Sequence, residues 1–121
     1  MEASVQDGGG QTLSGRLPLC RLDEIEDPGS RGFDDIEGEA PFFVVRRGDD
    51  AFAYRNSCPH YGAPLDWKPH AFLSVDKTRI LCSMHGALFG IEDGACVAGP
   101  CPGDLLARVE IDVADGTVFL I

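Results

Sequence analysis

The chain has 121 residues, which is enough for one domain with a modest core and too few for a second, catalytic domain. Its 20 acidic and 10 basic residues give a formal net charge of −10. Such acidity argues against nucleic acid and anionic membranes as partners and favours a partner with a basic docking face. Solubility alone would explain the same charge, so both interpretations stay open.

Residues 1–15 are polar and glycine-rich, and we expect this N-terminal segment to be disordered. It has neither the basic start nor the apolar run of a secretory signal, and no stretch of the chain is as long as a membrane span. Without an export signal, the five cysteines are expected to be metal ligands and free thiols rather than a disulfide framework. We therefore expect a soluble, cytoplasmic protein.

From residue 16 onward, short apolar runs broken by Gly, Pro and Asp predict one all-β domain over residues 16–121. Strands are predicted in chain order at residues 17–22, 41–47, 51–55, 79–81, 109–113 and 117–121. Gly48-Asp49-Asp50 and Asp115-Gly116 are expected to turn two pairs of these strands into hairpins. No segment has a convincing amphipathic helical pattern. A small antiparallel β-sandwich fits this arrangement.

Two short motifs carry the chemistry, Cys58-Pro59-His60 and Cys82-Ser83-Met84-His85. Cys58 and His60 are two residues apart, so both side chains can face one side of an extended segment, whereas a tight turn would bring Cys82 and His85 together. Two thiolates and two imidazoles can hold zinc, or a [2Fe–2S] cluster with cysteines on one iron and histidines on the other. The spacing alone therefore predicts a Cys₂His₂ site and leaves the metal open.

The stretches from Cys58 to Leu65 and from Cys82 to Gly86 resemble the ligand loops of Rieske iron–sulfur proteins. The resemblance extends over the chain from residue 16 onward. It implies a Rieske-like antiparallel β-sandwich with a cluster-binding subdomain of two ligand loops and one [2Fe–2S] cluster per chain. Carried over to this chain, Cys58 and Cys82 would hold the inner iron, and His60 and His85 would hold the outer iron near the surface.

The resemblance also implies where the reduction potential lies. High-potential Rieske proteins have a disulfide between the ligand loops, and Ala63 and Met84 stand at the matching positions here. Those proteins also have a serine and a tyrosine after the second histidine, where this chain has Ala87 and Phe89. Both differences favour the low end of the Rieske range, about −150 mV, and hence a ferredoxin rather than a quinol-oxidising protein.

The function implied is that of a soluble one-electron carrier rather than an enzyme, with no catalytic residue of its own. It would take electrons from a flavin-dependent reductase and pass them to a terminal oxygenase or another oxidoreductase. Two alternatives are a small Rieske subunit of a larger oxidoreductase complex, such as a nitrite-reductase-like one, and a zinc-binding interaction module.

Three further features need an interpretation. The interval between Cys58 and Cys82 is longer than in the simplest ferredoxin pattern, and an extra turn or hairpin within residues 67–78 would fill it. His70 has no paired cysteine and is interpreted as an ordinary loop histidine. Cys96 and Cys101 are interpreted as small buried or loop residues, rather than as a second metal site or a redox-active disulfide.

Overall fold

The computed structural model describes residues 16–34, 36, 38–59, 64–66, 68–83, 86–99 and 103–121. These residues contain one short 3₁₀ helix, Leu22–Glu24, and no α-helix. The strands are β1 (Leu17–Arg21), β2 (Gly29–Phe33), β3 (Phe42–Arg47), β4 (Asp50–Arg55), β5 (Ile80–Leu81), β6 (Leu88–Phe89), β7 (Cys96–Ala98), β8 (Ile111–Ala114) and β9 (Thr117–Leu120). The predicted all-β fold is confirmed. The prediction for residues 1–15 lies outside the described residues.

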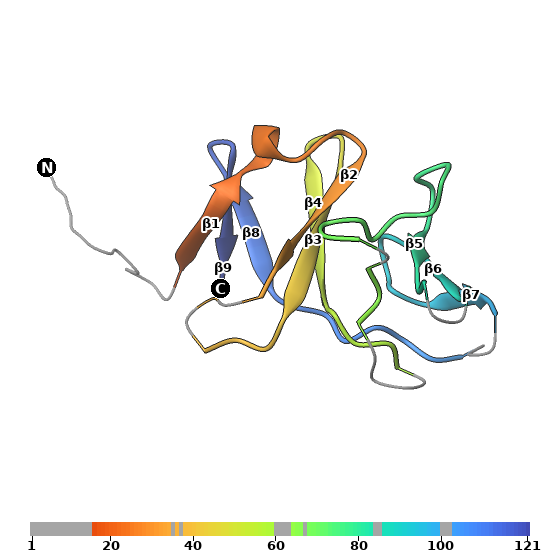
Figure 1. Ribbon diagram of the computed structural model, residues 1–121. Coiled ribbons are helices and arrows are strands. Elements are labelled where there is room, and N and C mark those ends of the chain that lie inside the picture. Colours follow the sequence, from red (N-terminus) through yellow and green to blue (C-terminus); the bar gives the residue numbers. More distant parts are fainter. Residues whose placement is uncertain are drawn as a thin grey trace, which may run out of the picture.

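The strands form three antiparallel sheets of three strands each, in the orders β1-β9-β8, β2-β3-β4 and β5-β6-β7. Figure 1 shows the first two sheets side by side as a base and the small third sheet at the other end of the molecule. The sheet β2-β3-β4 thus lies in the middle. Within the base, it is the sheet that faces the part of the chain that carries the two cysteine motifs.

Strand β3 explains why the middle sheet is buried on both faces. Phe42 and Val44 belong to a base core shared with β9, whereas Phe43 and Val45 belong to a second core, which we call the loop core. Successive side chains of a strand point to opposite faces, so a strand covered on both sides needs an uninterrupted apolar run. All four side chains are at most 1% exposed, as this requirement predicts.

The two predicted hairpins are confirmed, with small shifts of their ends. Asp50 opens β4 instead of belonging to the turn, and β8 begins at Ile111. The turn between β8 and β9 places both Asp115 and Gly116 at positive φ, 52° and 76°, which is the backbone of the tight two-residue hairpin. The first strand ends at Arg21 because Leu22 begins the 3₁₀ helix.

Strand β2 was not predicted from the sequence. Its residues Gly-Ser-Arg-Gly-Phe lack an apolar alternation, and pairing along β3 from Gly29 to Phe33 holds them extended. The outer edge of β2 is covered in turn by residues 70–72. Gly32 N donates to His70 Nδ1 at 3.0 Å, and Ser30 Oγ donates to the His70 carbonyl at 2.7 Å. His70 therefore joins the base to the part of the chain that carries the two cysteine motifs, residues 56–106, which we call the loop region.

The long interval between the two cysteine motifs contains the expected hairpin. Leu73 and Ile80 form an isolated antiparallel bridge, and Ser74 N donates to the Arg79 carbonyl at 2.9 Å. Lys77 adopts a left-handed backbone, with φ of 61°, at the tip. This hairpin leads directly into β5 and thence to Cys82.

Candidate metal centre

Two buried cysteines define the candidate site. Cys58 follows β4 after a short connection and is 1% exposed, and Cys82 follows β5 directly and is 0% exposed. Both side chains belong to the loop core, together with Leu65, Ala87 and Ile91. Two strands from different sheets therefore deliver the predicted cysteine ligands into the same apolar environment.

The backbone around Cys82 forms a closed turn. Gly86 N donates to the Cys82 carbonyl, and Cys82 N donates to the Ala87 carbonyl, both at 2.9 Å. Gly86 has φ of +70°, in the region where residues with a side chain are strained, and no atom would contact a Cβ there. The glycine after the second motif is thus needed for its backbone conformation and not for close packing.

The two histidine ligands predicted from the sequence, His60 and His85, lie outside the described residues. Their assignment therefore stays a prediction. Among the residues that are described, no group of three or more His, Cys, Asp or Glu side chains could hold a metal ion.

The surroundings of the two cysteines fit a mixed-ligand [2Fe–2S] cluster. The described cores contain no buried polar or charged residue, so this region disfavours a large net charge. Two ferric ions, two sulfides, two thiolates and two neutral imidazoles sum to zero, whereas four thiolates would leave a charge of −2. The apolar setting of Cys58 and Cys82 thus suits the Cys₂His₂ cluster better than an all-cysteine one.

The second motif is packed from one side by Gly99. A Cβ on Gly99 would lie 2.7 Å from the Ala87 Cα, and Gly99 has φ of +103°. The residues that follow, 100–102, are Pro-Cys-Pro in the sequence and lie outside the described residues. Gly99 therefore lies against the turn that carries Cys82.

The remaining cysteines differ in their surroundings. Cys96 opens β7 and its Sγ contacts the Ala98 carbonyl at 3.4 Å, and Cys101 lies outside the described residues. Cys20 lies in β1 and packs against the base core. Burial raises the pKa of the Cys20 thiol, with Arg31 opposing the shift, so this thiol is protonated at neutral pH.

Tyr54 supports the site from β4. It is fully buried, and its hydroxyl donates to the Ile91 carbonyl at 2.7 Å within the loop core. Desolvation raises the pKa of Tyr54, so the phenol stays a neutral donor. This bond ties the strand that leads to Cys58 to the segment that follows β6.

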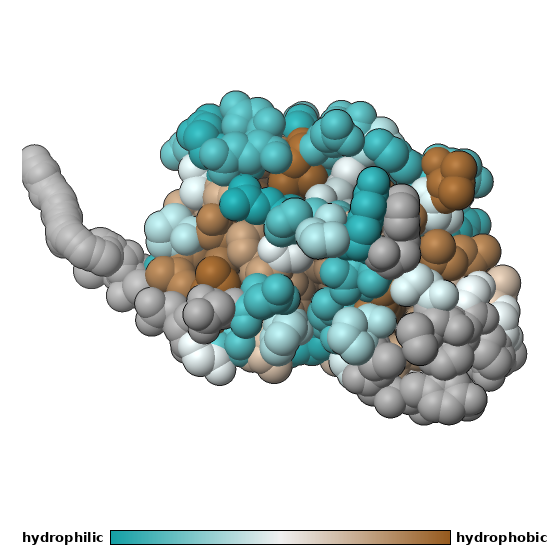
Figure 2. All heavy atoms as spheres, in the orientation of Figure 1, coloured by the Kyte–Doolittle hydropathy of each residue, from teal (hydrophilic) through white to brown (hydrophobic). Residues whose placement is uncertain are grey.

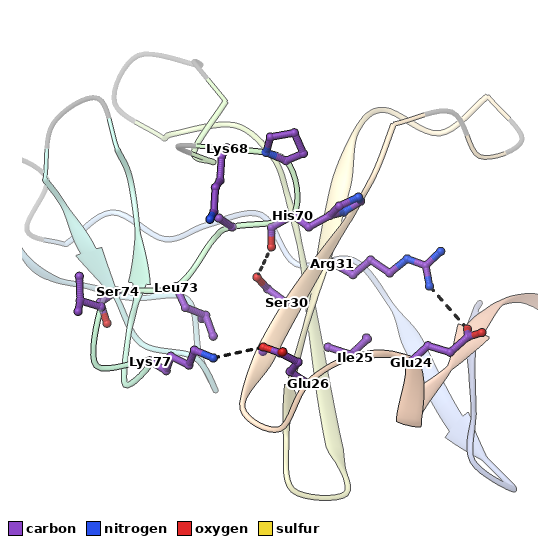
Figure 3. Close-up of a pocket in the computed structure, with 14 residues that line it drawn as sticks. Glu24, Ile25, Glu26, Ser30, Arg31, Lys68, His70, Leu73, Ser74 and Lys77 are labelled. Atoms are coloured by element: carbon purple, nitrogen blue, oxygen red, sulfur yellow. Dashed lines mark hydrogen bonds and ion pairs between the residues drawn. The ribbon is translucent and has the colours of Figure 1, made fainter.

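A cavity of about 740 Å³ lies beside the long interval and contains neither cysteine of the candidate site. Its described walls are residues 24–26 and 29–31 of the base and residues 68–71, 73–75 and 77 of the loop region, as Figure 3 shows. Lys77 reaches across to Glu26 at 3.4 Å, and Ser30 bonds to the His70 carbonyl. The described walls of the cavity therefore lie at the joint between the base and the loop region, and they include neither Cys58 nor Cys82.

Asp76 organises the tip of the inserted hairpin. Its Oδ1 accepts hydrogen bonds from Ser74 Oγ at 2.7 Å, Thr78 Oγ1 at 2.7 Å and Thr78 N at 3.1 Å. These bonds, first that from Ser74, lower the pKa of Asp76 from 3.8 to about 2. The tip also exposes Val75 completely.

We expect the Asp76 contacts to stabilise the hairpin in a pH-dependent way. Because the folded pKa is below the unfolded value of 3.8, the stabilisation is present above pH 3.8 and is lost as the pH falls towards about 2. The Tm difference between wild type and Asp76→Asn should shrink over this range. A difference that stays constant with pH would contradict the role given to the carboxylate. The exposure of Asp76 makes the effect small.

Figure 2 shows hydrophilic residues along the edge of the molecule that carries the 3₁₀ helix and the β3–β4 turn. Exposed carboxylates are spread over the described surface: Asp23, Glu24, Glu26, Asp27, Asp34, Asp49, Asp50, Asp76, Glu92, Asp93, Glu110 and Asp115. Within the described ranges, no helix is both long and apolar enough to cross a membrane. The acidity seen in the composition is therefore a property of the protein surface.

Comparison with known proteins agrees with this geometry. The family model of the Rieske [2Fe-2S] domain matches residues 15–111. Ferredoxin CarAc of Metapseudomonas resinovorans is 29% identical over 104 residues, covering 86% of this chain and 91% of that protein. The anthranilate 1,2-dioxygenase ferredoxin subunit of Burkholderia cepacia is 30% identical over 112 residues, covering 88% of this chain and 92% of that protein.

A solved structure shows the same similarity in three dimensions. A chain in the complex of reduced oxygenase and oxidized ferredoxin in carbazole 1,9a-dioxygenase superposes with a TM-score of 0.71 at 28% identity. The match covers 87% of this chain and 100% of that chain. The fold of this chain therefore has a counterpart that matches over nearly its whole length.

Proposed function

Because the chain belongs to the Rieske [2Fe-2S] domain family, we propose that it is a ferredoxin that delivers single electrons to a terminal oxygenase. The observation that carries the proposal is the family match over residues 15–111, within which Cys58 and Cys82 are buried in one apolar core. Its relatives are ferredoxins, which carry electrons and catalyse no reaction on a substrate, so the prediction of a carrier rather than an enzyme is confirmed.

The proposed ligands are Cys58 and Cys82 on one iron and His60 and His85 on the other. When bound, the [2Fe–2S] cluster supplies a centre that accepts and releases one electron. The chain's own residues bury the thiolates and hold the turn between Cys82 and Gly86. Ala87 and Phe89 have no hydroxyl group that could donate a hydrogen bond to a cluster sulfur. These two apolar side chains support a potential near the low end of the Rieske range, about −150 mV.

For partners, we propose a flavin-dependent reductase as donor and an oxygenase with a basic docking face as acceptor. A structurally similar chain belongs to a complex of oxygenase and ferredoxin, which supports an oxygenase acceptor here. The exposed carboxylates and the net charge of −10 support a basic face on the partner. We further infer that the protein acts in the cytoplasm and that residues 16–121 form the functional domain.

Two alternatives were left open by the sequence. The similar proteins carry ferredoxin names, which favours a ferredoxin over a small subunit of a nitrite-reductase-like complex. Rieske domains carry a [2Fe–2S] cluster, which disfavours a zinc-binding interaction module. Iron and zinc analysis of the purified protein distinguishes the [2Fe–2S] ferredoxin from the zinc-binding module directly.

The experiment that tests the proposal is EPR spectroscopy of the dithionite-reduced protein, followed by anaerobic mixing with an oxidised Rieske oxygenase. We expect a rhombic signal of a mixed-ligand cluster and its decay as the oxygenase becomes reduced. The transfer rate should fall with added salt because the docking faces are oppositely charged. A colourless protein with bound zinc would overturn the electron-carrier function, and a salt-independent rate would overturn the basic docking face.

Replacing one proposed outer ligand should change the potential without removing all iron. In His60→Cys, a thiolate replaces a neutral imidazole, so the cluster becomes more negative and harder to reduce. We expect the potential to move from about −150 mV towards the value of about −400 mV typical of four-cysteine clusters. Spectroelectrochemical titration would measure it.

His70→Asn is the matched control, because asparagine tolerates the left-handed backbone of His70, with φ of 67°, and can still accept from Gly32 N. This variant should keep the wild-type potential. A His60→Cys protein with an unchanged potential would remove His60 from the ligand set.

A further inference from the structure

Asn56 lies between β4 and Cys58 and makes hydrogen bonds in three directions. Its backbone N donates to the Pro41 carbonyl at 3.0 Å, which fixes it to the base. Its side-chain Oδ1 accepts from Leu65 N at 2.7 Å, and its Nδ2 donates to Asp66 Oδ1 at 3.1 Å. Asn56, two positions before Cys58, is thus fixed to the base by its backbone. Its half-buried side-chain amide holds Leu65 and Asp66, where the first ligand loop ends.

The chain of hydrogen bonds continues to the second motif. The Leu65 carbonyl accepts from Ser83 N at 3.0 Å, and Ser83 directly follows Cys82. Leu65 is 0% exposed, so its amide and its carbonyl both need partners within the protein. Asn56 satisfies the amide and Ser83 satisfies the carbonyl. The link therefore runs from the approach to Cys58, through Leu65, to the residue after Cys82.

We propose that Asn56 is a positioning residue that sets the separation and orientation of the two cluster-binding loops. The proposal deepens the proposed function and rests on Cys58 and Cys82 being cluster ligands. A metal site tolerates only small errors in ligand position, and partners that hydrogen-bond behind the ligands govern metal affinity. Asn56 acts through Leu65 and Ser83, and it is not assigned as a ligand.

The geometry favours an asparagine over other residue types at this position. Leu65 N needs an acceptor, whereas the Asp66 carboxylate needs a donor, and a terminal amide supplies one of each. Aspartate would keep the acceptor and place a second negative charge against Asp66. Leucine has a similar size and would leave the buried Leu65 amide without its partner.

The test compares iron release to a chelator and the EPR line shape in three variants. We expect Asn56→Leu to lose iron about tenfold to a hundredfold faster than wild type and to give a broadened or shifted signal. The double variant Asn56→Asp with Asp66→Asn exchanges donor and acceptor across the pair while keeping the acceptor for Leu65 N. It should restore the wild-type rate and signal. The single Asn56→Asp variant should release iron at an intermediate rate, and it serves the test if Asn56→Leu does not fold.

Ser30→Ala is the control for a purely structural effect, because it removes bonds to His70 and Phe72 at the base joint and touches neither ligand loop. For the same decrease in Tm, Ser30→Ala should release iron more slowly than Asn56→Leu does. Equal release rates, or an Asn56→Leu protein with the wild-type rate and signal, would overturn the proposal. A wild-type protein without a [2Fe–2S] signal would instead overturn the proposed function, so the two failures are distinguishable.

Discussion

Replacement of Cys82 by alanine is expected to give a protein with no visible absorption from iron–sulfur charge transfer and no EPR signal after reduction. Cys82 is 0% exposed in an apolar core, and no nearby buried polar side chain in the described part of the chain could take over its role. In the proposed ligand set the Cys82 thiolate binds the inner iron, and alanine has no donor atom to replace it. Cys58→Ala should behave in the same way. Iron and acid-labile sulfide analysis, together with the visible spectrum, would measure the loss.

Cys20→Ala provides the matched control for this result. Cys20 is a half-buried thiol in β1 that packs against the base core, away from the loop core. Its removal should leave the iron content and the spectrum unchanged. A Cys82→Ala protein that retained wild-type iron and its spectrum would overturn the assignment. Circular dichroism would show whether a variant without iron has kept its β-structure, because loss of a bound metal centre also lowers stability.

Replacement of Phe72 by alanine is expected to cost about 3–5 kcal/mol in the free energy of unfolding. The Phe72 ring stacks on Phe43 of the middle sheet, with centroids 4.2 Å apart and planes 6° apart, and is 1% exposed. Gly32 packs on the same ring, since a Cβ there would lie 3.1 Å from it. Small domains have about 5–15 kcal/mol in total, so the loss is a large fraction of the stability. Denaturant unfolding followed by circular dichroism would measure it.

Phe119→Ala is the comparison for Phe72→Ala. Phe119 lies in β9, is only half-buried and has the Arg16 guanidinium 5.8 Å from its ring centroid. Its truncation removes less buried area and should cost clearly less than that of Phe72. Phe72→Ala should also speed iron loss, because Leu81 N, next to Cys82, donates to the Phe72 carbonyl from a segment that the ring anchors. Equal costs for the two variants would contradict the role of Phe72 as the anchor of the loop region.

Local sequence signals were sufficient wherever a short stretch determines its own conformation. Asp115-Gly116 adopts the positive φ values of a tight hairpin because a two-residue connection between twisted strands requires them. The two cysteine motifs predict a metal site for a similar reason, since ligand types and their spacing are local properties. The longer interval between the motifs also indicated a hairpin correctly, and the bridge between Leu73 and Ile80 closes it.

Other features depended on contacts between distant residues and could not be predicted locally. Strand β2 has two glycines and one apolar end residue, and only its pairing with β3 makes it a strand. Asn56 carried no distinctive signal beyond being a polar residue at the end of a strand near a ligand. Its partner Leu65 lies nine positions away, and that residue's partner Ser83 lies on the other motif.

The sequence by itself determined the class of the fold, the two cysteine–histidine motifs that predict the cluster ligands, and the negative net charge. Each of these follows from residue type and short-range spacing. Only the tertiary structure decided that Phe42 and Phe43 serve two different cores, and that Cys58 and Cys82 enter the same one. The physical reason is that burial and hydrogen bonding depend on which segments pack together. The segments that cover the two faces of the middle sheet are far apart in the chain, so local sequence patterns do not show which of them meet.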